Sequence, residues 1–161
     1  MAPAFARTHR RGRLCLLAAA VLSLVLAGCG PINLTAPPAT PTNFAGLLGR
    51  LAVAKISVDA YVSGDAGCTD QDMVQSAISF HAQGLDQAAP IKLYLYIFRD
   101  DDAFKKHLAQ VGPCAESWVT DPSTYDEIDQ SPYVLAGQGP WPAQFKAALR
   151  ATLDAAAGTG G

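Results

Sequence analysis

The sequence predicts an α+β fold: a single small domain in which an antiparallel sheet of four to five strands is covered by helices and carries one disulfide. Three observations predict it. Apolar and polar residues alternate in several short segments, as in strands. Other segments repeat apolar residues with helical spacing. Residues 43–156 of the 161-residue chain also match the size of one ordinary domain.

In the first part of this domain, the sequence pattern predicts a helix, a strand and a short helix. Asn43 can cap a helix whose apolar face holds Phe44, Leu47, Leu48 and Leu51, because these positions follow the i, i+3, i+4, i+7 spacing. Alternation then predicts a strand over 56–62. The small and acidic residues of 63–67 favour a turn, and Thr69 or Asp70 can cap a short helix through Ser76.

The clearest strand is 91–98, where aliphatic side chains point one way and Lys92, Tyr94, Tyr96 and Phe98 point the other. We expect it to be central, with its aliphatic face against helices that cover one face of the sheet. Residues 78–82 share the period and predict its antiparallel partner. Residues 83–90 would join the two in a loose hairpin.

The remaining elements are predicted from caps and breakers. Asp100, Asp101 and Asp102 suit the start of a helix that Gly112-Pro113 ends. Trp118 and Val119 can extend a strand, and 121–123 is a turn. Short strands are expected over 125–129 and 133–136. Trp141-Pro142 opens a last helix, whose buried stripe comprises Phe145, Ala148, Leu149, Thr152 and Leu153.

The N-terminus carries an export signal. Arg7, Arg10, Arg11 and Arg13 precede an apolar run over 14–26, which ends in Leu26-Ala27-Gly28-Cys29. This motif resembles the lipobox of bacterial lipoproteins, and the resemblance implies removal of residues 1–28 and acylation of Cys29. A transmembrane anchor is the first alternative, but the run is shorter than the roughly 20 residues that span a bilayer. A plain cleaved signal, the second, requires no cysteine after Gly28.

The resemblance implies a signal peptide (1–28) and a lipidated Cys29. Composition and size then indicate a Pro/Thr-rich tether up to residue 42, the domain (43–156) and a disordered tail (157–161). The resemblance also implies a partner, the membrane, and a location on the extracytoplasmic side of the cell membrane, or of an outer membrane where the host has one. Without the four leader arginines, 14 acidic residues outweigh the basic ones. An acidic domain of this kind argues against nucleic-acid binding.

The cysteines support an exported domain. By the lipoprotein resemblance, Cys15 would leave with the leader and Cys29 would carry lipid. Cys68 and Cys114 would then remain in an oxidising compartment, where we expect them to pair. A redox role is the alternative. The pair lacks the Cys-x-x-Cys spacing that lowers a thiol pKa, so the sequence favours a structural disulfide.

Catalytic motifs are absent from the sequence, which leaves catalysis open but disfavoured, and we expect no cofactor. The mature chain has two histidines, His81 and His107, too few for a structural zinc once the cysteines pair. Asp65, Asp70 and Asp72 surround Cys68 and could form a calcium loop, although their spacing differs from an EF-hand. An exported hydrolase would use carboxylates such as Asp65, Asp100 or Asp126.

Aromatic residues offer the remaining candidate site. Tyr94 and Tyr96 share a strand face, and an antiparallel hairpin can place His81 beside them. If no helix covers that face, it can bind a small ligand or an envelope protein. Alternatively the face is solvated, or packs under the C-terminal segment with Trp118 and Trp141. The sequence thus predicts a non-catalytic binding or envelope-interaction module, with a purely structural envelope protein as an alternative.

Overall fold

The computed structural model describes residues 44–158, which form a five-stranded antiparallel sheet of order β1-β2-β3-β5-β4. This confirms the predicted α+β class with one antiparallel sheet. Along the chain the elements are α2 (Phe44–Val53), β1 (Ile56–Ser63), α3 (Gln71–Val74), β2 (Ala77–Gly84), β3 (Gln87–Ile97), α4 (Asp101–Glu116), the 3-10 helix η2 (Pro122–Thr124), β4 (Tyr125–Gln130), β5 (Tyr133–Gln138) and α5 (Ala143–Ala157).

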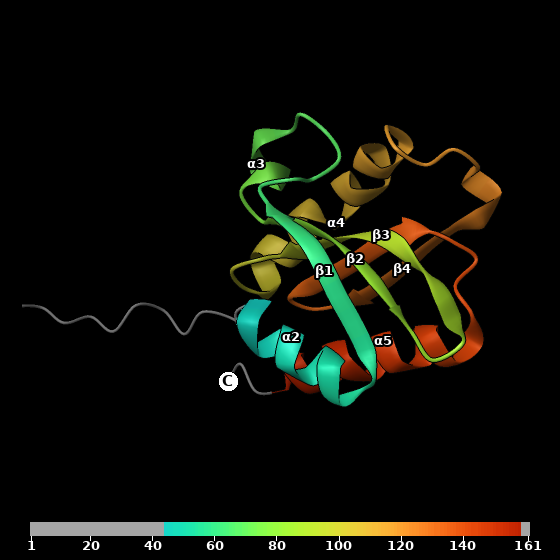
Figure 1. Ribbon diagram of the computed structural model, residues 1–161. Coiled ribbons are helices and arrows are strands. Elements are labelled where there is room, and N and C mark those ends of the chain that lie inside the picture. Colours follow the sequence, from blue (N-terminus) through green and yellow to red (C-terminus); the bar gives the residue numbers. More distant parts are fainter. Residues whose placement is uncertain (1–43, 159–161) are drawn as a thin grey trace, which may run out of the picture. The chain divides into compact units, whose positions relative to one another are not determined.

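Helices cover both faces of the sheet, so the expectation of one covered face is wrong (Figure 1). On one face, which we call the α5 side, α2 and α5 lie side by side. The core there comprises Leu47, Leu51, Ile56, Phe80, Ala82, Leu93, Leu95, Ile128, Tyr133, Leu135, Trp141, Phe145, Leu149, Leu153 and Ala156.

The opposite face, which we call the α4 side, packs against α3 and α4. Its core comprises Ala66, Met73, Ala77, Tyr94, Tyr96, Phe98, Phe104, Val111, Cys114, Val134 and Ala136. Strand β3 is central as predicted, and from Leu93 to Tyr96 both of its faces are buried, because alternate side chains contact one of the two cores. All residues of both cores lie within 44–158, so this part of the chain contains the apolar contacts that it needs to fold alone.

Cys68 and Cys114 form the predicted disulfide, with their Cα atoms 5.0 Å apart. Cys114 lies inside α4, because this helix continues through Gly112-Pro113 to Glu116 instead of ending there. Proline in a helix costs a backbone hydrogen bond. The burial of Val111, Cys114 and Ala115 around it outweighs that local stop signal.

Two connections differ from expectation. Strands β2 and β3 pair as far as Gly84 and Gln87, so the hairpin is tight and residues 83–90 are not a loose loop. Leu85 makes the turn at φ 55°, without the Asn-Gly signature that predicts such turns. Trp118 and Val119 do not extend a strand. Their N–H groups donate to the Ala115 carbonyl, which continues the turn that ends α4.

Other predictions are confirmed. Asp70 caps α3 by accepting hydrogen bonds from the N–H groups of Asp72 and Met73. Strand β1 covers the predicted residues, but its pairing shifts at Ala60, at φ 50°. Residues 1–43 and 159–161, with the leader, Cys29, the tether, the Asn43 cap and most of the tail, lie outside the described residues. Within 44–158, no helix is long and apolar enough to cross a bilayer.

Candidate functional site

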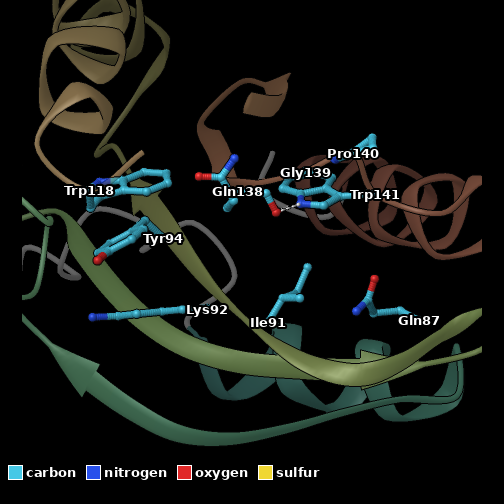
Figure 2. Close-up of a pocket in the computed structure, with 9 residues that line it drawn as sticks. All are labelled: Gln87, Ile91, Lys92, Tyr94, Trp118, Gln138, Gly139, Pro140 and Trp141. Atoms are coloured by element: carbon cyan, nitrogen blue, oxygen red, sulfur yellow. Dashed lines mark hydrogen bonds between the residues drawn. The ribbon is translucent and has the colours of Figure 1, made fainter. Parts of the chain in front are cut away.

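A groove of about 530 Å³ opens between β3 and the segment that joins β5 to α5 (Figure 2). Its size is that of a small-ligand site. Tryptophans lie on two of its walls and the strand forms a third. The lining residues are Gln87, Ile91, Lys92, Tyr94, Trp118, Gln138, Gly139, Pro140 and Trp141.

The first wall is a stack of Trp118 on Tyr94, with ring centroids 4.4 Å apart. Lys92 lies at the same tyrosine, with Nζ 4.8 Å from its ring centroid. Trp118 also packs over Gly67, where any Cβ would collide with the indole and where φ is 72°. Only glycine fits both conditions at this position. Gly67 therefore sets the position of Trp118.

The second wall is Trp141, whose side chain is almost fully buried. Its indole Nε1–H donates to the Gln138 carbonyl at 3.2 Å, and its backbone N–H donates to Asp126 Oδ2 at 2.6 Å. Lys146 of α5 forms an ion pair with the same carboxylate. Asp126 therefore ties the start of α5 to β4 and holds Trp141 at the groove.

The polar side chains of the groove are held by neighbouring residues. Gln138 Oε1 accepts from the Thr120 N–H at 3.0 Å, and its Nε2 donates to the Asp121 carbonyl at 3.1 Å. Gln87 Nε2 donates to the Ala89 carbonyl at 2.6 Å. Rings, aliphatic chains and the half-exposed Lys92 side chain remain as the contact surface, in a fixed arrangement suited to binding by shape. Within residues 44–158, Trp118 Nε1 is a buried donor without a hydrogen-bond partner.

Of the predicted aromatic face, only Tyr94 reaches this groove. Tyr96 is fully buried, its hydroxyl donates to the Ala66 carbonyl at 2.8 Å, and burial raises its pKa. His81 is half-buried and lies opposite Lys92 on the adjacent strand, with Nδ1 3.6 Å from Asp59 Oδ1. The tyrosine face is not open, because Trp118 and α4 cover it, in line with the alternative in which this face packs with Trp118.

The candidate carboxylates serve separate structural roles. Asp65 accepts hydrogen bonds from Ser79 Oγ at 2.6 Å, Lys92 Nζ at 2.8 Å and the Gly67 N–H at 3.0 Å. Burial raises the pKa of Asp65, but these three donors outweigh burial and leave the pKa lowered. Asp100 caps α4 by accepting from the Ala103 N–H at 2.8 Å.

The arrangement offers no metal centre in the part of the chain that the structure describes. Asp70 caps α3, Asp72 lies in its first turn, and Asp65 bonds to Lys92. Over residues 44–158, no three His, Cys, Asp or Glu side chains come together in a group that could hold an ion.

Sequence reasoning missed one unusual carboxyl, Glu127 on the edge strand β4. Burial raises the pKa of Glu127, a hydrogen bond donated by the Tyr125 hydroxyl opposes this shift and Asp129 adds to it, so that the pKa is about 7. The alternating Tyr125, Glu127 and Asp129 were the available signal, since alternate residues of a strand share a face. This face is on the α4 side, where Tyr125 packs against the core.

Comparisons with protein-family models, with curated proteins and with solved structures found no match for this chain. The role of the groove is therefore argued from its geometry and from the chemistry of its walls. The aromatic walls are Tyr94, Trp118 and Trp141, and the other lining residues are polar, aliphatic or small.

Proposed function

We propose that the protein is an exported lipoprotein, attached to a membrane through acylated Cys29, whose α+β domain binds a small ligand or an envelope protein without catalysis. The observation that carries the binding role is the groove between Trp118 and Trp141. The lipobox Leu26-Ala27-Gly28-Cys29 and the leader before it support the membrane location.

The state of the polar groups favours binding over hydrolysis. Lys92 is paired with Asp65, and Asp126 is bound to Lys146 and to the Trp141 backbone. Asp100 caps α4 and takes part in neither of these two ion pairs. A carboxylate-dependent hydrolase needs two carboxyls facing one scissile bond. Nothing in the groove supplies that pair, whereas its stacked rings suit a bound apolar surface.

Tryptophan fluorescence tests the binding role directly, because the chain has two tryptophans and both line the groove. We would titrate chain 30–161 with soluble peptidoglycan fragments and with fractionated envelope proteins. We expect one of these probes to shift the emission in a saturable manner. Gln87→Arg, which places a long side chain in the groove, should abolish the shift, whereas Gln75→Arg on the surface should not.

A saturable ligand whose affinity is the same for both arginine variants would contradict binding in the groove. The absence of any emission change across both sets of probes would contradict the binding role itself. The second result would favour the structural envelope protein, whereas the first would place ligand binding outside the groove.

Mass spectrometry of the protein from its host tests the anchor. We expect the mature chain to begin at Cys29 and to carry acyl groups, since stable attachment needs more than one chain. Cys29→Ser should leave the leader uncleaved and the residue unacylated. An unmodified Cys29, or an intact leader in the unaltered protein, would overturn the membrane attachment.

A further inference from the structure

The two edges of the sheet differ in their regularity. Strand β1 forms one edge, where the pairing register shifts between Asp59 and Val62 and Ala60 has a φ of 50°. Such a break makes a strand edge a poor template for another strand. Strand β4 forms the other edge and pairs with β5 through six consecutive residues without a shift. It contains no proline, so its outer edge can pair with a further strand.

The register shows which backbone groups of β4 face outward. Alternate residues of an antiparallel strand bond to opposite neighbours. The Ile97 N–H donates to the Ser76 carbonyl, which precedes β2, so the even-numbered residues of β3 that lie opposite β5 bond to β5. Continued through β5, this alternation makes the even-numbered residues of β4 bond to β5. The N–H and C=O groups of Tyr125, Glu127 and Asp129 therefore point away from the sheet, and within 44–158 no strand lies beyond them.

The side chains at this edge are acidic. Glu127 and Asp129 share the α4 side of β4, and neither forms an ion pair with a basic residue of the described chain. Asp126, on the other side, is paired with Lys146. Between Lys106 and Lys146 the sequence has five acidic residues and neither Lys nor Arg. The two carboxyls of the α4 side are therefore available to a cation from outside this domain.

Charge selects the strand that can pair at this edge. An antiparallel second copy of β4 would place Glu127 and Asp129 opposite carboxyls of the same kind, and like charges across a strand pair are destabilising. A lysine or arginine opposite either residue would stabilise the pair instead. In strand addition, backbone hydrogen bonds provide affinity, and side chains at alternate positions provide specificity.

We propose that the outer edge of β4 binds an extended segment of another protein with basic residues at alternate positions, which adds to the five-stranded sheet as a further strand. Its main chain pairs with the outward groups of Tyr125, Glu127 and Asp129, and its basic side chains lie against the two carboxyls. Six residues of β4 extend over about 20 Å, so a segment of similar length covers the edge. No residue of β4 lines the groove, and the site depends neither on the groove nor on acylated Cys29.

Defined peptides test the backbone pairing on chain 30–161. The probe is a fluorescent peptide of about eight residues, long enough to cover β4, that alternates lysine with threonine and is blocked at both ends. We expect saturable binding by fluorescence anisotropy, weakened by added salt. The same peptide with glutamate in place of lysine should bind about tenfold more weakly or not at all, because its charges would face carboxylates.

Backbone methylation distinguishes strand addition from simple charge attraction. One version of the lysine peptide carries methyl groups on its lysine backbone nitrogens, and the other carries them on its threonine nitrogens. Only one of these sets faces β4, and the other faces water. We therefore expect one version to bind about tenfold more weakly and the other to keep its affinity. Equal affinities of the unmethylated peptide and both versions would overturn the proposal, and so would equal losses by both versions.

A pair of matched variants tests the charges. Glu127→Gln with Asp129→Asn should weaken binding of the lysine peptide by up to about fivefold for each charge removed. Asp72→Asn with Asp102→Asn removes two exposed carboxyls from α3 and α4 and should leave the affinity unchanged. Equal affinities of the two variants would contradict recognition at β4.

Hydrogen exchange locates the contact. With the lysine peptide bound, the N–H groups of Tyr125, Glu127 and Asp129 should exchange more slowly, whereas those of β1 should keep their rates. Protection at β1 or at the groove instead, or no binding of the lysine peptide, would overturn the proposal. Concentration-dependent dimers that protect the β4 edge without peptide would do so too, by assigning it to a second copy. None of these measurements uses a groove ligand or lipid, so their failure leaves the proposed function to its own tests.

Discussion

The two faces of the sheet are stabilised in different ways. The α5 side is closed mainly by purely apolar side chains such as Leu93, Phe145 and Leu149, with Tyr133 and Trp141 as its aromatic residues that carry a polar atom. The α4 side contains the buried Tyr96 hydroxyl, the raised-pKa carboxyl of Glu127 and the disulfide. Burial of apolar area suffices on the first face. The second depends on satisfied hydrogen bonds and a covalent link, and it also supports one wall of the groove.

Removal of the disulfide, which belongs to the α4 side, should have the largest effect on the free energy of unfolding. Replacing Cys68 and Cys114 together by alanine should lower the free energy of unfolding by about 4 kcal/mol, because the bond closes a chain segment with a sequence separation of 46. Urea unfolding measures the change. Free-thiol titration of the unaltered protein should find no reactive thiol in 44–158. A loss below about 1 kcal/mol would show that packing alone holds the α4 side.

Truncation on the α5 side should cost nearly as much. Leu93→Ala leaves a cavity in a fully buried site and should lower the free energy of unfolding by about 2–5 kcal/mol. Ile97→Ala, a half-buried position on the same strand, is the matched control and should cost less. Equal losses at the two positions in urea unfolding would contradict a tightly packed α5 side.

A polar deletion on the α4 side should have a smaller effect. Tyr96→Phe keeps the ring but removes the hydroxyl that donates to the Ala66 carbonyl. A buried acceptor without a donor costs about 1–3 kcal/mol. Tyr94→Phe changes a tyrosine whose ring stacks on Trp118, and it should cost less. If Tyr96→Phe were neutral in thermal unfolding, hydrogen bonding would not distinguish the two faces.

The smallest effect concerns pH and Glu127. Because its pKa is raised from 4.5 to about 7 in the fold, the folded protein holds a proton that the unfolded chain releases. Its stabilisation is complete below about pH 4.5 and is lost as pH rises through about 7. Tm should therefore fall between pH 5 and pH 8, and Glu127→Gln should reduce this fall.

The control for this pH dependence is Asp121→Asn. Hydrogen bonds from Ser123 lower the pKa of Asp121 below its usual value, so this group changes stability only at acid pH. Its variant should keep the fall in Tm between pH 5 and pH 8. A steeper fall in the Glu127→Gln variant would contradict a protonated carboxyl at this site.

Local patterns predicted most of the elements of the domain. The strand alternation around Leu93 and the apolar stripe that includes Phe145 and Leu149 each identify a buried face, because their periods differ. The Asp70 and Asp100 caps were also predicted, since a carboxylate before a helix accepts its first N–H groups.

The errors have a common physical cause, since tertiary packing decided them. Tyr94 and Tyr96 suit an exposed strand face as well as an aromatic core, so the sequence alone could not show that α4 covers them. The local stop signal at Gly112-Pro113 was overridden by burial on both sides of it. The groove depends on Trp118 and Trp141. These residues are distant in sequence, and only the fold brings both of them to the lining of one groove.

The position of α5 after all five strands has a consequence for biosynthesis. The core on the α5 side is completed by Phe145, Leu149 and Leu153. The Asp86 carboxylate accepts a hydrogen bond from the Phe145 N–H at the start of this helix. A nascent polypeptide that has not yet been released from the ribosome far enough to expose these residues lacks half of that layer. It should stay sensitive to proteases until α5 is available to pack, and a stop codon before Phe145 should yield a product that is degraded instead of accumulating.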